Sequence, residues 1–222
     1  MKLYNNYKNI PILFSGGGSI LPWRQHLQPC EYLETDGNSY IHIVDFNYNY
    51  NVNIKLEFNL LGDYFGRYGH KGGGNNRNAY IGYSDTGQNF LFELASGGNQ
   101  TAVTANSNKI IIDSEKTSYK YFDFDGNLLA SRNWYNYNVT FNNNYLFAAW
   151  NSSIIPAPEG TKIYYNEYKG IIDLIACYVI DEYTDNKGNL CSGGVAGMVD
   201  TMTGIFYTND GPGQFTHGGD IY

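Results

Sequence analysis

The acidic side chains of this 222-residue chain are the first place to look for catalysis. Hydrolysis of a glycosidic bond with retention needs two carboxylates about 5 Å apart, which within one strand requires acidic residues on the same face. Glu31 and Glu34 fall on opposite faces, and Glu57 is alone in its strand. Asp123 and Asp125 have the right spacing, but Asp125 belongs to a hairpin turn. These spacings predict that the chain is not an enzyme.

Metal and phosphate binding are the next chemistries to test. Residues 123–127, Asp-Phe-Asp-Gly-Asn, start like a calcium loop, but no Glu stands where that loop would end. We therefore favour a tight hairpin at Asp125-Gly126. The run Gly72–Gly74 lacks the Lys-Ser/Thr of a phosphate-binding loop. We expect no cofactor and no metal, although calcium in another Asp/Asn-rich loop stays open.

The cysteines form neither a metal-binding pattern nor a disulfide framework. They are Cys30, Cys177 and Cys191. Cys177 ends an apolar run that starts at Ile171, which predicts a buried, inert thiol. A bridge between Cys177 and Cys191 is the alternative. The histidines are far apart in the sequence and are predicted at the surface or in turns: His26, His42, His70 and His217.

Aromatic residues beside Asn, Arg or His could form a sugar site, because such sites combine an aromatic platform with polar partners on loops. Two stretches have this composition. The candidate glycan-binding residues are Arg67, Tyr68 and His70 in the first stretch, and Trp134, Tyr135, Asn136 and Tyr137 in the second. The interpretation that we favour for each stretch is that the aromatic rings alternate into the core while Asn makes turns.

Residues 1–29 differ from the rest of the chain. Ser15-Gly-Gly-Gly-Ser19 is a flexible joint, and the segments beside it contain prolines and little alternation. We interpret the region as an extended arm that tethers the domain to a partner or to neighbouring copies, since Trp and Arg are frequent energetic anchors at interfaces. The expected partner-binding residues are Ile12, Phe14, Trp23 and Arg24. The alternative is an N-terminal strand that lies along the domain.

Composition assigns residues 30–222 to an all-β class. Aromatic residues make up 17% of the chain, with 22 Tyr, and there are 26 Gly. Tyr favours half-buried strands and Gly favours turns, and so high an aromatic content argues against disorder. Val52–Leu60 alternates strictly between apolar and polar residues, and similar strand patterns recur at short intervals. We therefore predict an antiparallel β-sandwich preceded by the arm.

Charge and hydropathy exclude some partners. The net charge is −7 and the isoelectric point is about 5.0, whereas neutralising phosphates needs a basic surface. We therefore expect no nucleic-acid partner. No apolar run is long enough for a spanning helix, so we expect no membrane insertion. The polar N-terminus lacks the apolar core of a signal peptide, which predicts assembly in a cytoplasm.

Two phrases carry a resemblance to a known family. Residues 195–219 read V-A-G-M-V-D-T-M-T-G-I-F-Y-T-N-D-G-P-G-Q-F-T-H-G-G, and residues 31–41 read E-Y-L-E-T-D-G-N-S-Y-I. Both resemble the ends of a concanavalin A-like (laminin-G-like) jelly-roll domain found in phage structural proteins, of the type seen in crAss-like phages of Bacteroidales. Phe65-Gly66-Arg67 departs from the family's third phrase, because it lacks an intervening residue.

The resemblance implies a concanavalin-like jelly roll and a function as a virion structural protein. The expected role is a head-fibre or decoration-type appendage on the virion surface, anchored by the arm and forming a homo-oligomer. Its expected partners are other virion proteins of the capsid or tail, and the attachment point (capsid, portal or tail) stays open. The alternative is a glycan-binding, lectin-like module of a tail fibre that attaches to a host surface glycan.

Overall fold

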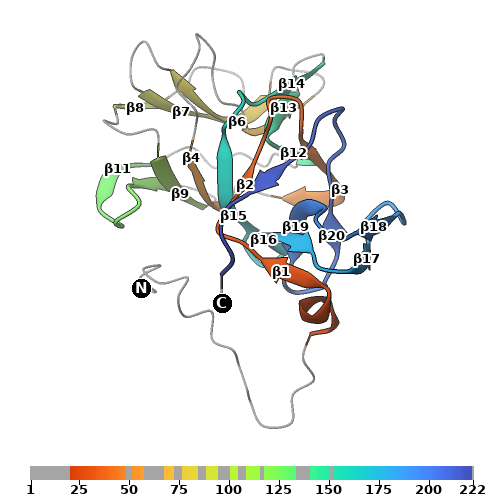
Figure 1. The fold of residues 1–222 in the computed structure, drawn as a ribbon. Coiled ribbons are helices and arrows are strands. Elements are labelled where there is room, and N and C mark those ends of the chain that lie inside the picture. Colours follow the sequence, from red (N-terminus) through yellow and green to blue (C-terminus); the bar gives the residue numbers. More distant parts are fainter. Residues whose placement is uncertain are drawn as a thin grey trace.

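The computed structural model describes residues 21–48, 52–57, 68–72, 77–84, 89–94, 101–104, 109–115, 118–133, 141–150 and 153–221. This part of the chain is built almost entirely of antiparallel strands, so the predicted all-β class is confirmed (Figure 1). The described residues contain no helix that is long and apolar enough to cross a membrane. The finer jelly-roll topology stays a prediction.

The largest sheet has eleven strands. Its main path runs β11 (Leu128–Asn133), β10 (Ser118–Phe122), β9 (Lys109–Glu115), β4 (Val52–Glu57), β15 (Lys162–Tyr168), β16 (Ile172–Val179), β19 (Ala196–Asp200) and β20 (Phe206–Tyr207). Off this path, β1 (Leu27–Pro29) pairs with β16, and β2 (Leu33–Glu34) pairs with β15 and β21 (Thr216–His217). Every pairing in this sheet between named strands is antiparallel.

Three smaller sheets complete the described fold (Figure 1). A six-stranded sheet contains β14 (Ile154–Pro156), β13 (Ala148–Trp150), β5 (Tyr68–Gly72), β6 (Arg77–Ser84), β7 (Asn89–Leu94) and β8 (Thr101–Thr104). The other two are the pair β3 (Ile41–Tyr48) with β12 (Phe141–Leu146) and the pair β17 (Glu182–Thr184) with β18 (Leu190–Ser192). Within the six-stranded sheet, β13 pairs with β5 in parallel.

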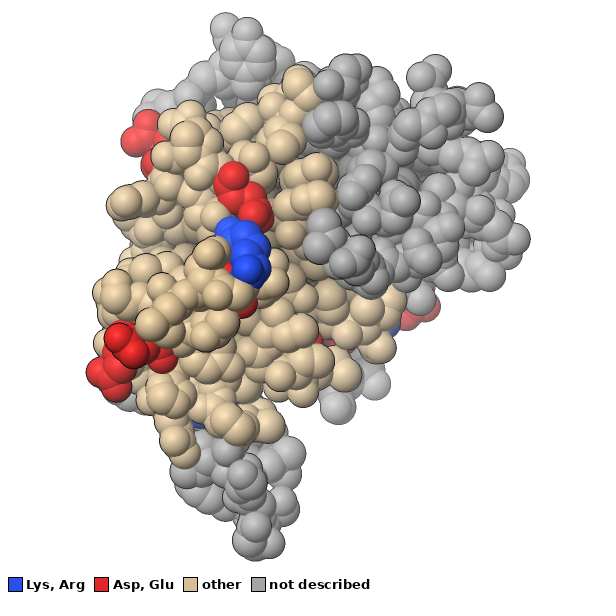
Figure 2. Space-filling view, turned by 90° about the vertical axis from the view of Figure 1, so that its right-hand side faces the viewer, with Lys and Arg blue, Asp and Glu red and all other residues tan. Residues whose placement is uncertain are grey.

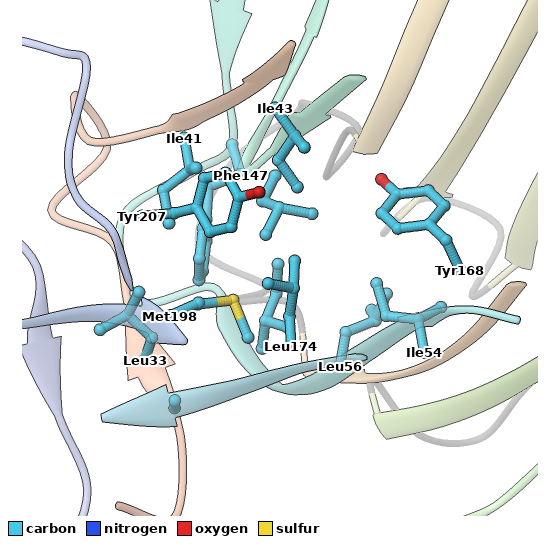
Figure 3. Packing of buried hydrophobic residues seen from close by; sticks show 14 of the residues in the cluster. Leu33, Ile41, Ile43, Ile54, Leu56, Phe147, Tyr168, Leu174, Met198 and Tyr207 are labelled. Atoms are coloured by element: carbon cyan, nitrogen blue, oxygen red, sulfur yellow. The ribbon is translucent and has the colours of Figure 1, made fainter. Parts of the chain in front are cut away.

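The main core lies between the large sheet and the β3–β12 pair (Figure 3). The alternation predicted for residues 52–60 is seen in β4, where Ile54 and Leu56 are fully buried in this core. Ile41 and Ile43 of β3 reach it from the opposite side, together with Phe147. We call the side of the large sheet that faces this core its inner face. Two layers of strands therefore enclose one apolar interior, as in a sandwich.

The outer face of the large sheet has an apolar cluster of its own. On β16, Leu174 points into the inner core, whereas Ile175 and Cys177 belong to the outer cluster. This agrees with the two-residue period of a strand. Trp23 and Leu27 cover the outer cluster and are only 2% and 1% exposed. The predicted burial of Cys177 is confirmed, and the cysteines are buried free thiols, with no bridge between Cys177 and Cys191.

Residues 22–29 lie along the domain. A short 3₁₀-helix, η2 (Pro22–Gln25), leads into β1, whose Leu27, Gln28 and Pro29 pair with β16 (Figure 1). This segment therefore follows the alternative interpretation, in which an N-terminal strand lies along the domain, and not that of an extended arm. Residues 1–20, with Ile12 and Phe14, lie outside the described residues, so the tether stays a prediction.

The two phrases that carry the family resemblance interlock in space. In the turn of residues 209–213, the Asn209 side chain accepts a hydrogen bond from the Tyr40 backbone N–H (3.0 Å), and the Asp210 carboxylate accepts one from the His42 N–H (2.7 Å). In return, the Asp36 carboxylate accepts a hydrogen bond from the Gln214 N–H (2.9 Å). The pairing of β2 with β21 continues the contact. The ends of the domain therefore close on one another.

Glycine is required where the closing phrase packs tightly. A Cβ on Gly197 would lie 2.3 Å from the Tyr207 carbonyl oxygen, so no larger residue fits there without movement of the backbone. Gly204 has a φ of +79° in the turn between β19 and β20, a conformation that favours glycine. The hairpin predicted at Asp125-Gly126 is also present, with Gly126 at a φ of +85°.

Candidate functional site

A recess of about 140 Å³ lies on the outer face of the large sheet, beside the end that Trp23 covers. Its walls come from strands β1, β4, β15 and β16, from the segment after β1, and from residue 221. The recess is lined by Pro29, Cys30, Glu31, Lys55, Tyr164, Ile175, Ala176 and Ile221. It therefore combines an apolar lining with one ammonium group, one carboxylate and one phenol.

Lys55 is placed in the recess by the alternation of β4. Since Ile54 and Leu56 point into the inner core, Lys55 must point to the outer face. Its Nζ lies 4.3 Å from the centre of the Phe124 ring and 5.1 Å from the centre of the Tyr164 ring. Both distances suit a cation–π interaction. The ammonium group thus packs against two aromatic rings that touch each other.

Burial makes Lys55 unusual among the lysines of this face. Loss of solvent lowers the pKa of Lys55 below its ordinary value, the Glu31 charge opposes that shift, and the nearby Lys109 adds to it. Lys109 lies 3.4 Å from a Glu57 oxygen, and Lys162 lies 3.8 Å from a Glu34 oxygen. No described carboxylate lies that close to the Lys55 ammonium. Among the described residues none accepts a hydrogen bond from the Lys55 ammonium, so its donors remain available for a ligand.

The aromatic rings around Lys55 hold one another in place. Tyr164 packs edge-on against Tyr32 and Phe124, with ring centres 5.4 and 5.1 Å away. Its hydroxyl donates a hydrogen bond to Glu57 Oε2 at 2.9 Å, and burial together with this carboxylate raises the pKa of Tyr164. The ring set is therefore a rigid, neutral wall at neutral pH.

A row of polar residues crosses the same outer face on neighbouring strands. Asp113 of β9 pairs with Asn53 of β4, which pairs with Glu167 of β15, which in turn pairs with Asp173 of β16. Burial raises the pKa of Glu167 and the pKa of Asp173; the Asp173 charge adds to the shift at Glu167, and the Asp200 charge adds to the shift at Asp173. Carboxylates directly opposite on paired strands come close together.

Carboxylate spacing within single strands did not predict this acidic row, because its members lie on four different strands. Its members have partners in the chain: the Thr201 hydroxyl donates to Asp173 Oδ2 (2.8 Å), and Lys169 forms an ion pair with Asp113. Among the described residues no three His, Cys, Asp or Glu side chains are arranged to hold a metal ion. We interpret the row as a structural network.

The residues proposed from the sequence fall into three groups. Trp23 is committed to the domain's own core, and the Arg24 guanidinium lies 4.9 Å from its ring centre. Tyr68 and His70 belong to β5, where their backbones pair with β6. The remaining candidates lie outside the described residues: Ile12, Phe14, Arg67, Trp134, Tyr135, Asn136 and Tyr137. Trp23 and Arg24 are thus the only pair of these candidates in described side-chain contact.

The hairpin of residues 123–127, whose sequence starts like a calcium loop, is stabilised by hydrogen bonds from its own side chains. Asp123 Oδ1 accepts hydrogen bonds from the Asp125 N–H (3.0 Å) and the Asn127 N–H (2.8 Å), and the Asn127 side chain donates to Asp123 Oδ2. These bonds lower the pKa of Asp123. The carboxylate is therefore used to shape the turn that places Phe124.

Sequence reasoning did not select Lys55, Tyr164, Phe124 or Tyr32. The signal for Lys55 was present, because alternation predicts that Lys55 leaves the core. The three rings come from segments far apart in the sequence, so their approach to Lys55 depends on strand pairing. Figure 2 shows another face of the molecule, on which charged side chains are sparse and the described basic residues form no broad patch.

Comparisons with known proteins identify no relative. No family model matches the chain, and searches of the curated proteins and of the solved structures also find no match.

Proposed function

We propose that this chain is a structural, non-catalytic protein of a phage virion. In this proposal a concanavalin-like jelly-roll head is carried on the particle surface as a head-fibre or decoration-type appendage, and residues 1–20 tether it to a capsid or tail protein. The appendage assembles as a homo-oligomer in the host cytoplasm.

The observation that carries the proposal is the contact between the two family-like phrases. Residues 36–42 and 209–214 exchange side-chain and backbone hydrogen bonds in both directions. The tight position of Gly197 and the turn at Gly204 lie in the same closing phrase. The two family-like phrases therefore act together to close the domain. This contact supports the proposal that the chain shares the family's fold. The virion context itself rests on the sequence resemblance.

Virions purified from cells that express this chain provide the test. A cryo-EM map at side-chain resolution should contain the domain on the particle surface, with residues 1–20 ordered against another virion protein. A protein absent from the particle would contradict the proposal.

The tether needs a deletion that leaves the folded domain intact. Because Trp23 and Leu27 are buried in the outer cluster, the deletion should stop at residue 20. We expect the Δ1–20 variant to keep the Tm of the full chain and to lose incorporation into particles. Incorporation at the wild-type level would assign the attachment to the domain instead.

The second candidate function is a glycan-binding module of a tail fibre. The observation that favours it is the recess on the outer face, where the Tyr164 ring lies beside Glu31 and Lys55, since sugar sites combine a ring with a few polar groups. A surface appendage can carry such a site, so the two functions are compatible.

A further inference from the structure

We infer that the recess beside Lys55 binds one uronate residue of an acidic glycan, with the sugar carboxylate on the Lys55 ammonium and a sugar hydroxyl on Glu31. The inference concerns a specific site and ligand class, and it does not depend on where the protein is carried.

The half-buried ammonium of Lys55 favours an anionic partner. Burying an ammonium group is unfavourable unless the group is paired, and burial already lowers the pKa of Lys55. Phe124 and Tyr164 present ring faces to the ammonium, which offset part of this loss. Lys109 and Lys162 have carboxylates within 4 Å, whereas no described carboxylate lies that close to Lys55. A ligand carboxylate that enters the recess would form an ion pair with the Lys55 ammonium.

The volume of the recess selects a ligand of one ring. The recess holds about 140 Å³, and a protein cavity of about 150 Å³ accepts benzene. Pockets for larger ligands measure about 300–1,000 Å³. The recess therefore encloses about the volume of one unsubstituted six-membered ring, so the outer substituents of a sugar ring and the rest of a glycan chain must lie outside it.

The lining favours a sugar acid over an acidic peptide side chain. Pro29, Ile175 and Ile221 offer apolar surface to the C–H face of a ring. Glu31 offers an acceptor that a sugar hydroxyl satisfies, whereas an aspartate or glutamate side chain has no donor for it. A ligand that carries both a carboxylate and hydroxyls uses both polar groups.

The test uses the full chain and three small probes: glucuronate, glucose and propionate. Backbone amide shifts are followed by NMR while each probe is added up to concentrations on the order of 50 mM, enough to saturate a site with a Kd of a few millimolar. We expect saturable shifts with glucuronate at Glu31, Lys55 and Ile175. Glucose and propionate should each bind at least about tenfold more weakly, because each lacks one half of the recognised chemistry.

Variants separate the role of Lys55 from effects on folding. Lys55→Met should weaken glucuronate binding at least about tenfold, as expected for loss of a charge-assisted hydrogen bond, and Lys55→Arg should keep part of it. The matched control is Lys120→Met, which removes an exposed lysine on β10, two strands away from β4, and should bind like the wild type.

Each contrary result overturns the inference in a distinct way. If glucuronate causes no change in amide shifts, the recess does not bind a uronate. Propionate binding as tightly as glucuronate shows a simple carboxylate site, as for an acidic peptide, and glucose binding equally well shows that the charge is not recognised. Unchanged binding by Lys55→Met, with a Tm like that of the wild type, removes Lys55 from the site.

Discussion

The outer face of the large sheet has two ends that differ in what covers them. At the β16–β19–β20 end, Trp23 and Leu27 seal an apolar cluster that includes Cys177 and Phe206. At the β9–β4–β15 end, the same face carries Lys55 packed against aromatic rings, ion-paired lysines and a recess. A sheet face can be apolar only where another element excludes water from it.

The two ends of the outer face therefore differ in their expected roles. At the covered end, burial raises the pKa of Cys177 well above its ordinary value, which keeps the thiol protonated and inert. At the other end, partial burial keeps an ammonium group in a weakly hydrated setting where it can recognise an anion. The covered end stabilises the fold, and the recess at the other end is the candidate for binding.

The largest expected effect comes from uncovering the sealed end. Trp23→Ala should lower the free energy of unfolding by about 3–5 kcal/mol, because a large buried ring leaves a cavity over the outer cluster. Urea denaturation measures this loss. Trp23→Phe is the control and should cost much less, because its ring still fills most of the site and the Trp23 Nε1 has no described hydrogen-bond partner. A loss below about 1 kcal/mol for Trp23→Ala would show that residues 22–27 do not seal this face.

The next effect concerns the turn beside the covered end. Asp200 is buried and accepts hydrogen bonds from the Asp173 N–H (3.1 Å), the Met202 N–H (3.2 Å) and the Thr203 hydroxyl. Asp200→Ala should lower the free energy of unfolding by about 3 kcal/mol, because these donors lose a charged acceptor. Asp200→Asn keeps one oxygen acceptor and should lose less. Equal losses in the two variants would mean that the charge, and not the acceptor geometry, stabilises the turn.

A smaller effect with the opposite sign is expected at Lys55. Because the folded chain lowers the pKa of Lys55 below 10.5, the protonated group destabilises the fold at every pH below that lowered pKa. The penalty shrinks as the pH rises from that lowered pKa through 10.5, where the unfolded chain also loses the proton, and it vanishes above 10.5. Lys55→Met should therefore stay within about 1 kcal/mol of the wild type, with any advantage largest at neutral pH.

The measurement is the difference in free energy of unfolding between wild type and Lys55→Met, from pH 7 to pH 10.5. Lys120→Met, which changes an exposed group, should show no such trend. A Lys55→Met advantage that grows with pH would contradict the assigned pKa shift.

The smallest stability effect is expected in the hairpin that positions Phe124. Asp123→Ala removes the side-chain hydrogen bonds to the Asp125 and Asn127 backbones. Because these bonds are exposed to solvent, the loss should be below about 1 kcal/mol. Glucuronate binding should nevertheless weaken if Phe124 leaves Lys55, and NMR titration detects that change. Wild-type affinity in this variant would show that the Asp123 hydrogen bonds are not needed for the site.

Much of the fold followed from local patterns. Alternation in β4 predicted the burial of Ile54 and Leu56, and the apolar run before Cys177 predicted a buried thiol. The Asp-Gly pair predicted the hairpin at Gly126. These predictions succeed because a strand's period and a turn's φ requirement act over a few residues.

The candidate site could not be predicted in the same way. Trp23 was proposed as a partner anchor from its residue type, yet the pairing of β1 with β16 places it in the chain's own core. The row from Asp113 to Asp173 depends on the register of four neighbouring strands. Register joins segments that are distant in the sequence, so spacing along one segment cannot reveal it.

The sequence by itself determined the class of this protein: an acidic, tyrosine-rich, all-β chain whose turns are marked by glycine and whose strands are marked by alternation. Only the tertiary structure decided which polar side chain loses its water. Lys55 and Lys120 both leave the core by alternation, but Lys55 packs against two rings while Lys120 stays exposed. The physical reason is that desolvation depends on neighbours in space, and strand pairing sets those neighbours.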